Sequence, residues 1–235
     1  MPAELSLNGT VVIVGNYGSG KTEVAVNLAI HQRRQGRGIQ LADLDLVNPY
    51  FRTREAREVL TALGIQLVLP PAELLQADLP ILAPSVAGLI RKPADLAILD
   101  VGGDPVGATV LSALADIFAQ RRHEVSMLQV VNPYRPGTAT TQGCLAMRAA
   151  IEGKAKLAVT GWIGNAHMLD ETGWEHVQYG YRFMCALASE SGLPVRFVTA
   201  PAHLSAQAGQ AQWNCPILPI HRQLVPPWQK PQAIR

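Results

Sequence analysis

The chain has 235 residues, of which 48% are hydrophobic and 16% charged, so it can bury the core of one large domain. A formal net charge of +2 without any run of lysine and arginine argues against a nucleic-acid partner. Three scattered cysteines, no secretory signal and no apolar stretch of membrane-spanning length predict a cytoplasmic protein that has reduced thiols and binds no membrane.

Apolar runs rich in β-branched residues alternate with helical patterns almost to the end of the chain. The expected strands are 10–14, 39–43, 65–69, 96–100, 125–131, 157–163, 195–199 and 217–219, and the expected helices are 22–35, 53–63, 108–120, 138–152 and 174–191. Because strands without polar alternation have both faces covered, the sequence predicts an α/β fold with a mostly parallel central sheet flanked by helices on both faces. We expect a single domain over 1–235, whose proline-rich segment 222–235 lies extended on the surface.

The first predicted strand runs into a glycine-rich loop that a helical pattern follows directly. The loop reads G-x-x-x-x-G-K-[ST], and its fixed positions are Gly15, Gly20, Lys21 and Thr22. Glycines let several backbone N–H groups converge on one anion, and the start of the helix adds its positive dipole end. Lys21 is expected to reach the β- and γ-phosphates of a nucleotide, and the Thr22 hydroxyl to bind Mg²⁺.

A plain strand-to-helix turn is the alternative, but the complete motif in this setting favours a phosphate-binding loop of the P-loop type. The expected nucleotide-binding residues of the loop are Gly15, Asn16, Tyr17, Gly18, Ser19, Gly20, Lys21 and Thr22.

Two acidic residues, Asp43 and Asp45, follow the second predicted strand in the stretch DLDLVNPYFRTRE. Side chains alternate along a strand, so both carboxylates are expected on the same side. They could share a magnesium ion, orient an attacking water molecule or deprotonate a substrate hydroxyl. Arg52 and Arg54 could bind a phosphate or a carboxylate. A surface turn with solvated arginines is the alternative.

A third polar cluster, LAILDVGGDP, begins with a buried strand that ends at Asp100. A carboxylate at such a place near a phosphate loop commonly holds Mg²⁺. Gly103 permits a backbone N–H to approach a γ-phosphate, whereas a strand-ending turn is the alternative. Because ligands bind at the carboxyl ends of parallel strands, we expect Lys21, Asp45 and Asp100 to meet at one edge of the sheet.

Asn165 ends the sixth predicted strand, where its planar amide could read a nucleotide base. The six histidines show no metal-ligand spacing.

The order of these motifs resembles the MinD/ParA/nitrogenase-iron-protein class of P-loop NTPases, also called the CobQ/CobB/MinD/ParA nucleotide-binding domain. The resemblance covers most of the chain and implies ATP and Mg²⁺ as ligands. It implies that Asp45 prepares the attacking water with Asp43 beside it, that Asp100 is the Walker B aspartate, and that Asn165 contacts adenine. The stretch CPILPI is similar to the late strand that borders the base. The candidate catalytic residues are Lys21, Asp43 and Asp45, and the candidate metal ligands are Thr22, Asp45 and Asp100.

One position departs from this class. Many members carry a second lysine just after the first loop glycine, which reaches the partner's nucleotide in an ATP-sandwiched dimer. Asn16 stands there, and an amide can hydrogen-bond a phosphate but supplies no positive charge. The sequence therefore does not decide whether the chain forms a homodimer. We expect the phosphate charge to be neutralised within one subunit.

The leading interpretation is a cytoplasmic, magnesium-dependent ATPase that acts as a nucleotide-dependent switch on an unidentified protein partner. ATP is preferred to GTP because the stretch GNAH lacks the N-K-x-D motif of most GTPases. A second interpretation is an ATP-dependent phosphotransferase or ligase, with Asp45 as base on a small-molecule acceptor. The D-x-D segment also resembles that of polynucleotide 5′-hydroxyl kinases. A third interpretation is a nucleotide-binding module without turnover.

Overall fold

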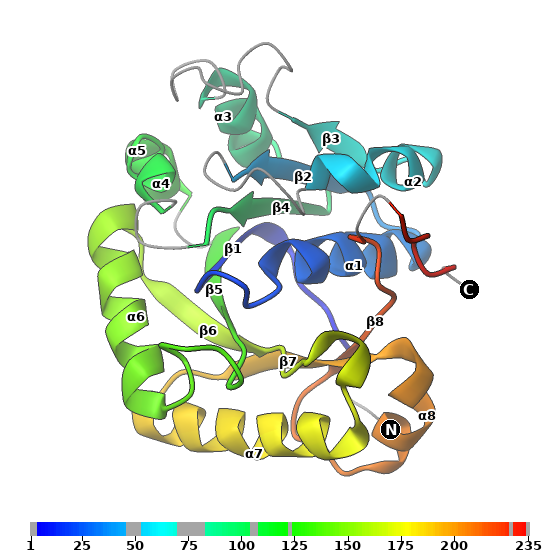
Figure 1. Cartoon of the computed structure of the whole chain (residues 1–235). Coiled ribbons are helices and arrows are strands. Elements are labelled where there is room, and N and C mark those ends of the chain that lie inside the picture. The colour runs from blue at the N-terminus through cyan, green and yellow to red at the C-terminus, as the bar shows by residue number, and fades with distance from the viewer. Residues whose placement is uncertain are drawn as a thin grey trace.

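Eight strands rich in β-branched residues form one sheet, in which every neighbouring pair is parallel (Figure 1). The computed structural model describes residues 4–45, 53–69, 83–103, 108–121, 124–225 and 228–233. The strands are β1 (Gly9–Gly15), β2 (Ile39–Leu44), β3 (Gln66–Val68), β4 (Leu96–Val101), β5 (Val125–Val131), β6 (Val159–Gly164), β7 (Val195–Pro201) and β8 (Ile217–Ile220). Their order is β3-β2-β4-β1-β5-β6-β7-β8, so the predicted parallel α/β sheet is confirmed.

Helices cover both faces of this sheet (Figure 1). The α-helices are α1 (Lys21–Arg34), α2 (Arg57–Ala62), α3 (Ala83–Arg91), α4 (Thr109–Ser112), α5 (Ala115–Gln120), α6 (Thr141–Ala155), α7 (Trp174–Ser191) and α8 (Ser205–Gln210). The 3-10 helices are η1 (Thr53–Ala56), η5 (Leu169–Glu171) and η6 (Ala202–Leu204). Val11 and Ile13 of β1 belong to the core under α1 and α2, whereas Val12 and Val14 belong to the core under α3 to α6. The alternation of buried residues on β1 thus fills two apolar layers.

Two helical predictions need correction, and two helices were not predicted. The helix expected over 108–120 is divided into α4 and α5, because Leu114 and Ile117 donate their N–H groups three residues back and tighten the chain. The helix expected over 53–63 begins as η1 and becomes α-helical only at Arg57. Helices α3 and α8 were not predicted, since both are short and each contains a glycine, Gly88 or Gly209.

Within the described ranges, no helix is both long and apolar enough to cross a membrane.

The segment after β8 is attached to α1 by two polar side chains of that helix. Asn27 accepts a hydrogen bond from the His221 N–H (2.8 Å) and donates one to the His221 carbonyl oxygen (3.1 Å). One turn earlier, the Glu23 carboxylate accepts the N–H groups of Gln223 (2.8 Å) and Leu224 (3.0 Å). These bonds hold the C-terminal segment beside α1 (Figure 1).

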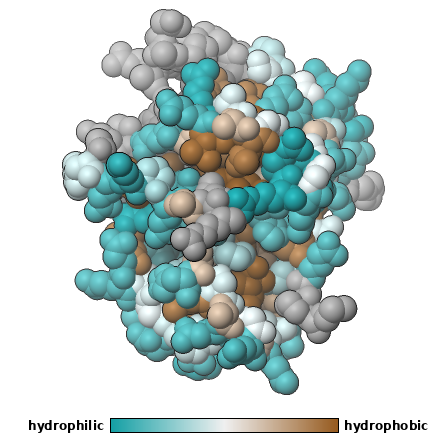
Figure 2. All heavy atoms as spheres, turned by 90° about the vertical axis from the view of Figure 1, so that its right-hand side faces the viewer, coloured by the Kyte–Doolittle hydropathy of each residue, from teal (hydrophilic) through white to brown (hydrophobic). Residues whose placement is uncertain are grey.

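The predicted surface tail over 222–235 is therefore only partly a surface segment. Gln223 and Leu224 are buried, and Leu224 belongs to the core under α1. Farther along, Trp228 is 82% exposed. Figure 2 shows the side of the molecule on which the chain ends, where apolar atoms are visible between polar side chains.

Replacement of Asn27 tests this attachment. Asn27→Ala leaves the N–H and carbonyl groups of His221 without their partners, so we expect the free energy of unfolding to fall by about 2 kcal/mol. Urea denaturation followed by circular dichroism measures it. Asn214→Ala is the control, because Asn214 is exposed. An Asn27→Ala variant as stable as the parent would show that the segment is held in another way.

Candidate functional site

The glycine-rich loop between β1 and α1 is shaped by backbone conformations that other residues rarely adopt. Gly15, Gly18 and Gly20 all have positive φ angles, of 149°, 70° and 85°. At Gly20 an added Cβ would also lie 2.3 Å from the Asn165 amide nitrogen, so a side chain has no room there. The loop closes with a hydrogen bond from the Ser19 N–H to the Asn16 carbonyl oxygen (3.2 Å). These features fit a loop whose N–H groups converge on an anion.

Lys21 lies inside this loop. Its ammonium group donates a hydrogen bond to the Asn16 carbonyl oxygen (3.2 Å), and the side chain is buried. Gly103, which follows β4, packs directly against it, since an added Cβ would lie 2.5 Å from the Lys21 ammonium nitrogen. A side chain at this position would displace the Lys21 ammonium group and press on the backbone of Tyr17, whose Cα would lie 3.1 Å from the added Cβ.

Asp100, near the end of β4, is fully buried beside the loop. Burial first, and then the neighbouring Asp43 carboxylate, raises the pKa of Asp100 to about 7, although Lys21, Thr22 and Thr53 act in the opposite direction. The Thr53 hydroxyl donates to Oδ2 of Asp100 (2.9 Å). Oδ1 of Asp100 has no hydrogen-bond partner within the described part of the chain. A buried oxygen of this kind beside a threonine hydroxyl fits a magnesium ligand.

The two acidic residues at the end of β2, Asp43 within the strand and Asp45 just after it, have different surroundings. Asp43 lies opposite Asp100 in the register of β2 and β4, and its Oδ1 accepts the N–H of Asp45 (3.1 Å). Asp45 instead lines the cavity in front of the loop. Arg52 lies outside the described residues, as do Asp104 and the side chain of Arg54.

A cavity of about 600 Å³ lies at the carboxyl ends of the strands. Lys21, Asp45 and Gly103 line one part of it, whereas Thr199 and Ile220 line another part near β7 and β8. The three predicted clusters therefore meet at one edge of the sheet, and the cavity has a volume in the range of known small-molecule sites. Within the described residues, no three His, Cys, Asp or Glu side chains form a metal-binding group.

Asn165 also lines the cavity, but both ends of its amide are already bound to the protein. Nδ2 donates to the Ser19 carbonyl oxygen (2.7 Å), and Oδ1 accepts from the Thr199 hydroxyl (2.6 Å). Asn165 thus connects the ends of β6 and β7 to the glycine-rich loop. The second hydrogen of Nδ2 is what it can offer to a base.

Several cavity residues were not identified from the sequence. Arg135 comes from the loop after β5, and its Nε donates to the Gly18 carbonyl oxygen (3.0 Å). Arg222 follows β8 and pairs with Asp170 (2.8 Å). Burial lowers the pKa of His167, and the positive charges of Arg135 and Arg222 lower it further, to about 4. No motif marks these residues, which are brought to the cavity by the order of the strands.

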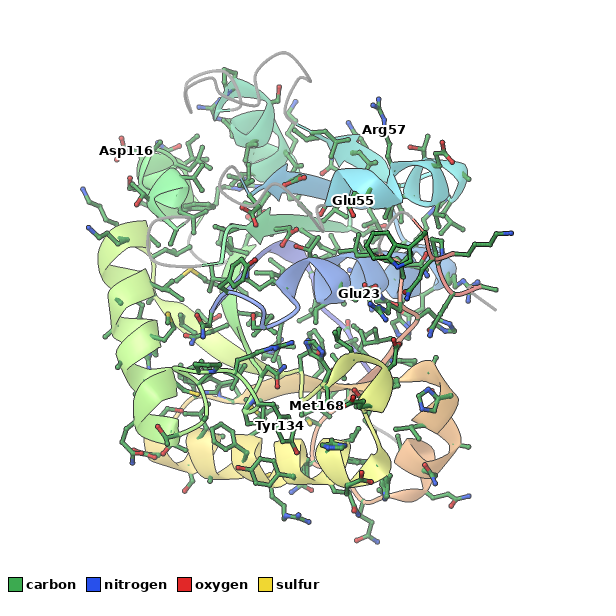
Figure 3. All side chains as sticks on the ribbon, in the orientation of Figure 1. Glu23, Glu55, Arg57, Asp116, Tyr134 and Met168 are labelled. Atoms are coloured by element: carbon green, nitrogen blue, oxygen red, sulfur yellow. The ribbon has the colours of Figure 1, made fainter. Side chains whose placement is uncertain are left out.

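Figure 3 labels three side chains on the elements around the cavity, of which Glu23 lines it. Glu23 lies on α1, whereas Met168 and Tyr134 lie nearer to α7.

No protein-family model matches the chain, and no curated protein matches its sequence. Solved structures do resemble its fold. The cell division protein FtsY of Thermotoga maritima matches with a TM-score of 0.59 and 22% identity over 84% of this chain and 65% of its own. The signal recognition particle receptor FtsY of Elizabethkingia anophelis in complex with GDP has a TM-score of 0.57, 17% identity and coverages of 84% and 58%.

The signal recognition particle 54 kDa protein of Aeropyrum pernix in complex with GDP gives a TM-score of 0.54 and 20% identity, over 83% of this chain and 42% of its own. The chain thus spans less than two thirds of the length of each of these proteins. Together these likenesses show that the chain has the α/β fold of a P-loop NTPase.

The raised pKa of Asp100 predicts that the stability of the ligand-free protein depends on pH. The pKa of Asp100 is about 7 in the fold and 3.8 ordinarily, so its stabilising contribution is complete below about pH 4 and is lost as the pH rises to 7. Asp100→Asn keeps an oxygen for Thr53 but removes the charge. We therefore expect the variant to be more stable than the parent at pH 8, by roughly 3 kcal/mol, with a smaller difference at pH 5.

Urea denaturation of both proteins from pH 5 to pH 8, without magnesium, measures this difference. Asp116→Asn is the control, because Asp116 is an exposed carboxylate on α5 (Figure 3). A stability difference that does not change with pH would contradict the assignment.

Proposed function

We propose that the chain is a magnesium-dependent nucleoside triphosphate hydrolase that acts as a nucleotide-dependent switch on a protein partner. The observation that carries this proposal is the meeting of Lys21, Asp45 and Gly103 at one cavity, beside the buried Asp100. These residues follow three different strands of a sheet with the fold of a P-loop NTPase. We further propose that residues 1–235 form one nucleotide-binding domain.

The roles follow from the chemistry of each group. Lys21 and the N–H groups of the glycine-rich loop bind the phosphates, and Thr22 and Asp100 hold the magnesium ion with Asp45 near it. Bound magnesium supplies positive charge that stabilises the transferring phosphoryl group. Asp45 orients the attacking water, because its carboxylate lies at the cavity wall and is not the one paired across β2 and β4.

The switch proposal is supported by the bond between Thr53 and Asp100. Thr53 begins η1, so the chain that leaves β2 is attached to the same carboxylate that we assign to magnesium. A change in the ligands of Asp100 would alter this attachment and move the segment before α2. A protein partner that contacts this segment would thus respond to the bound nucleotide.

The base would lie near Asn165 and Thr199, in the part of the cavity beside the ends of β6 and β7 and away from β4. ATP is the nucleotide that the resemblance implies, whereas two of the similar structures are complexes with GDP. Binding experiments must therefore compare both bases.

Lys21→Ala tests nucleotide binding. Loss of the buried ammonium group removes a charge-assisted contact with the phosphates, so we expect the affinity for the preferred nucleotide to fall by about 100-fold. Titration calorimetry with magnesium and either ATP or GTP measures it. Lys154→Ala, on the exposed side of α6, is the matched control. If Lys21→Ala binds as tightly as the parent, the proposed site is wrong.

Asp45→Asn tests turnover. The amide keeps the shape but loses the charge that orients water, so we expect hydrolysis to fall by about 100-fold or more while nucleotide binding is retained. The rate per molecule in the parent should depend only weakly on protein concentration, because Asn16 supplies no charge to a partner subunit. Steady-state phosphate release over a wide concentration range measures both properties.

Three results would contradict this account. Full activity of Asp45→Asn would remove that residue from the mechanism. A steep rise of the specific rate with protein concentration would show that a second subunit is needed. Turnover that requires an added small-molecule acceptor would favour a phosphotransferase.

A further inference from the structure

The loop between β5 and α6, residues 132–140, lies against the glycine-rich loop. Two hydrogen bonds join the two loops: Arg135 Nε donates to the Gly18 carbonyl oxygen (3.0 Å), and Asn16 Nδ2 donates to the Pro136 carbonyl oxygen (2.6 Å). An added Cβ on Gly18 would have the Arg135 side chain as its nearest neighbour, at 3.5 Å. Each loop therefore fixes the position of the other.

The β5–α6 loop is itself held in one conformation. The Asn132 side chain accepts the N–H of Tyr134 (3.1 Å), and its backbone oxygen accepts the N–H of Arg135 (3.1 Å) and the hydroxyl of Thr138 (2.8 Å). The Tyr134 ring packs on His176 of α7 at a centroid distance of 5.3 Å. Arg135 is thus presented from a turn that is anchored on two sides.

The guanidinium of Arg135 is directed to the cavity but is not neutralised there. Arg135 lines the cavity and is half-buried. In the parts of the chain that the structure describes, no carboxylate lies within salt-bridge distance of it, in contrast to Arg222, which pairs with Asp170. Among the described residues, the guanidinium makes one hydrogen bond, through Nε, so its two terminal NH₂ groups remain for another acceptor.

We propose that Arg135 is a phosphate-binding residue that contacts the α- or β-phosphate of the nucleotide from within the same subunit. This inference rests on the proposed function. A guanidinium that is held at Nε and presents its terminal nitrogens has the geometry that phosphate oxygens accept. It supplies positive charge from the chain's own β5–α6 loop, while the Asn16 side chain is occupied by Pro136 of the same loop.

The strand order decides which phosphates Arg135 reaches. Asp100 lies in β4 and Gly103 follows it, on one side of β1, whereas Arg135 follows β5, on the other side. A nucleotide that extends from β4 toward β7 has its γ-phosphate at the β4 side. The contact of Arg135 with Gly18 places it against the part of the loop that cradles the α- and β-phosphates. Arg135 would therefore contact phosphates that a nucleoside diphosphate and a nucleoside triphosphate have in common.

The experiment measures the affinities of the diphosphate, a non-hydrolysable triphosphate and the nucleoside, with the adenine or guanine base that the parent prefers. In Arg135→Ala we expect the diphosphate and the triphosphate to bind about 10- to 100-fold more weakly, by the same factor, and the nucleoside to bind as in the parent. Arg135→Lys should recover most of the loss. Lys154→Ala, which removes one charge from α6, should bind like the parent.

The salt dependence of nucleotide affinity and the melting temperature distinguish phosphate binding by Arg135 from a purely structural role as a support of Gly18. Arg135→Gln removes the charge while keeping a polar side chain, and its affinity should decrease less steeply with sodium chloride than that of the parent. A lower melting temperature with an unchanged salt dependence would overturn the inference.

The failure of this inference differs from the failure of the proposed function. If the parent binds nucleotide, Lys21→Ala does not and Arg135→Ala binds like the parent, only the role of Arg135 is wrong. A loss confined to the triphosphate or to turnover also overturns it. If the parent binds no nucleotide, both proposals are wrong.

Discussion

Two carboxylates on neighbouring strands, Asp43 and Asp100, constrain the whole site. They lie opposite each other in the register of β2 and β4, and both are buried. Two negative charges cannot lie together in a dry sheet edge without a proton, a cation or donors. The protein supplies Lys21 from the glycine-rich loop and hydroxyl groups from Thr22 and Thr53. Consequently the loop, the start of α1 and the start of η1 are all drawn to the end of β4.

The same constraint gives a physical reason for the proposal that this site binds a cation. The pKa of Asp100 is raised even with Lys21 and two hydroxyl groups beside it, so the positive charge of the protein alone is insufficient. A divalent cation that arrives with a nucleotide would relieve the repulsion and at the same time neutralise the phosphates. Binding of the metal and order around Thr53 are then coupled through one carboxylate.

The sequence predicts those parts of the fold and the site that depend on local pattern. The β-branched runs predicted the parallel sheet, and the glycine spacing predicted the loop at Lys21. The division of α4 from α5 and the helix α3 could not be predicted, because tertiary packing decides such short segments. Arg135 and Arg222 likewise carry no motif, since only the strand order brings the segments after β5 and β8 to the loop after β1.

The hydrogen bond of Asn16 bears on the expectation that this residue supplies no charge to a second subunit. A lysine at this position acts on a neighbouring subunit only if its side chain extends away from its own chain. Asn16 instead donates to the Pro136 carbonyl oxygen, and this bond joins the glycine-rich loop to the turn that presents Arg135. In this chain the side chain at position 16 therefore supports a contact between two loops of the same subunit. The charge that the nucleotide needs on this side would then come from a residue 119 positions later in the chain, which sequence spacing alone does not connect to the loop.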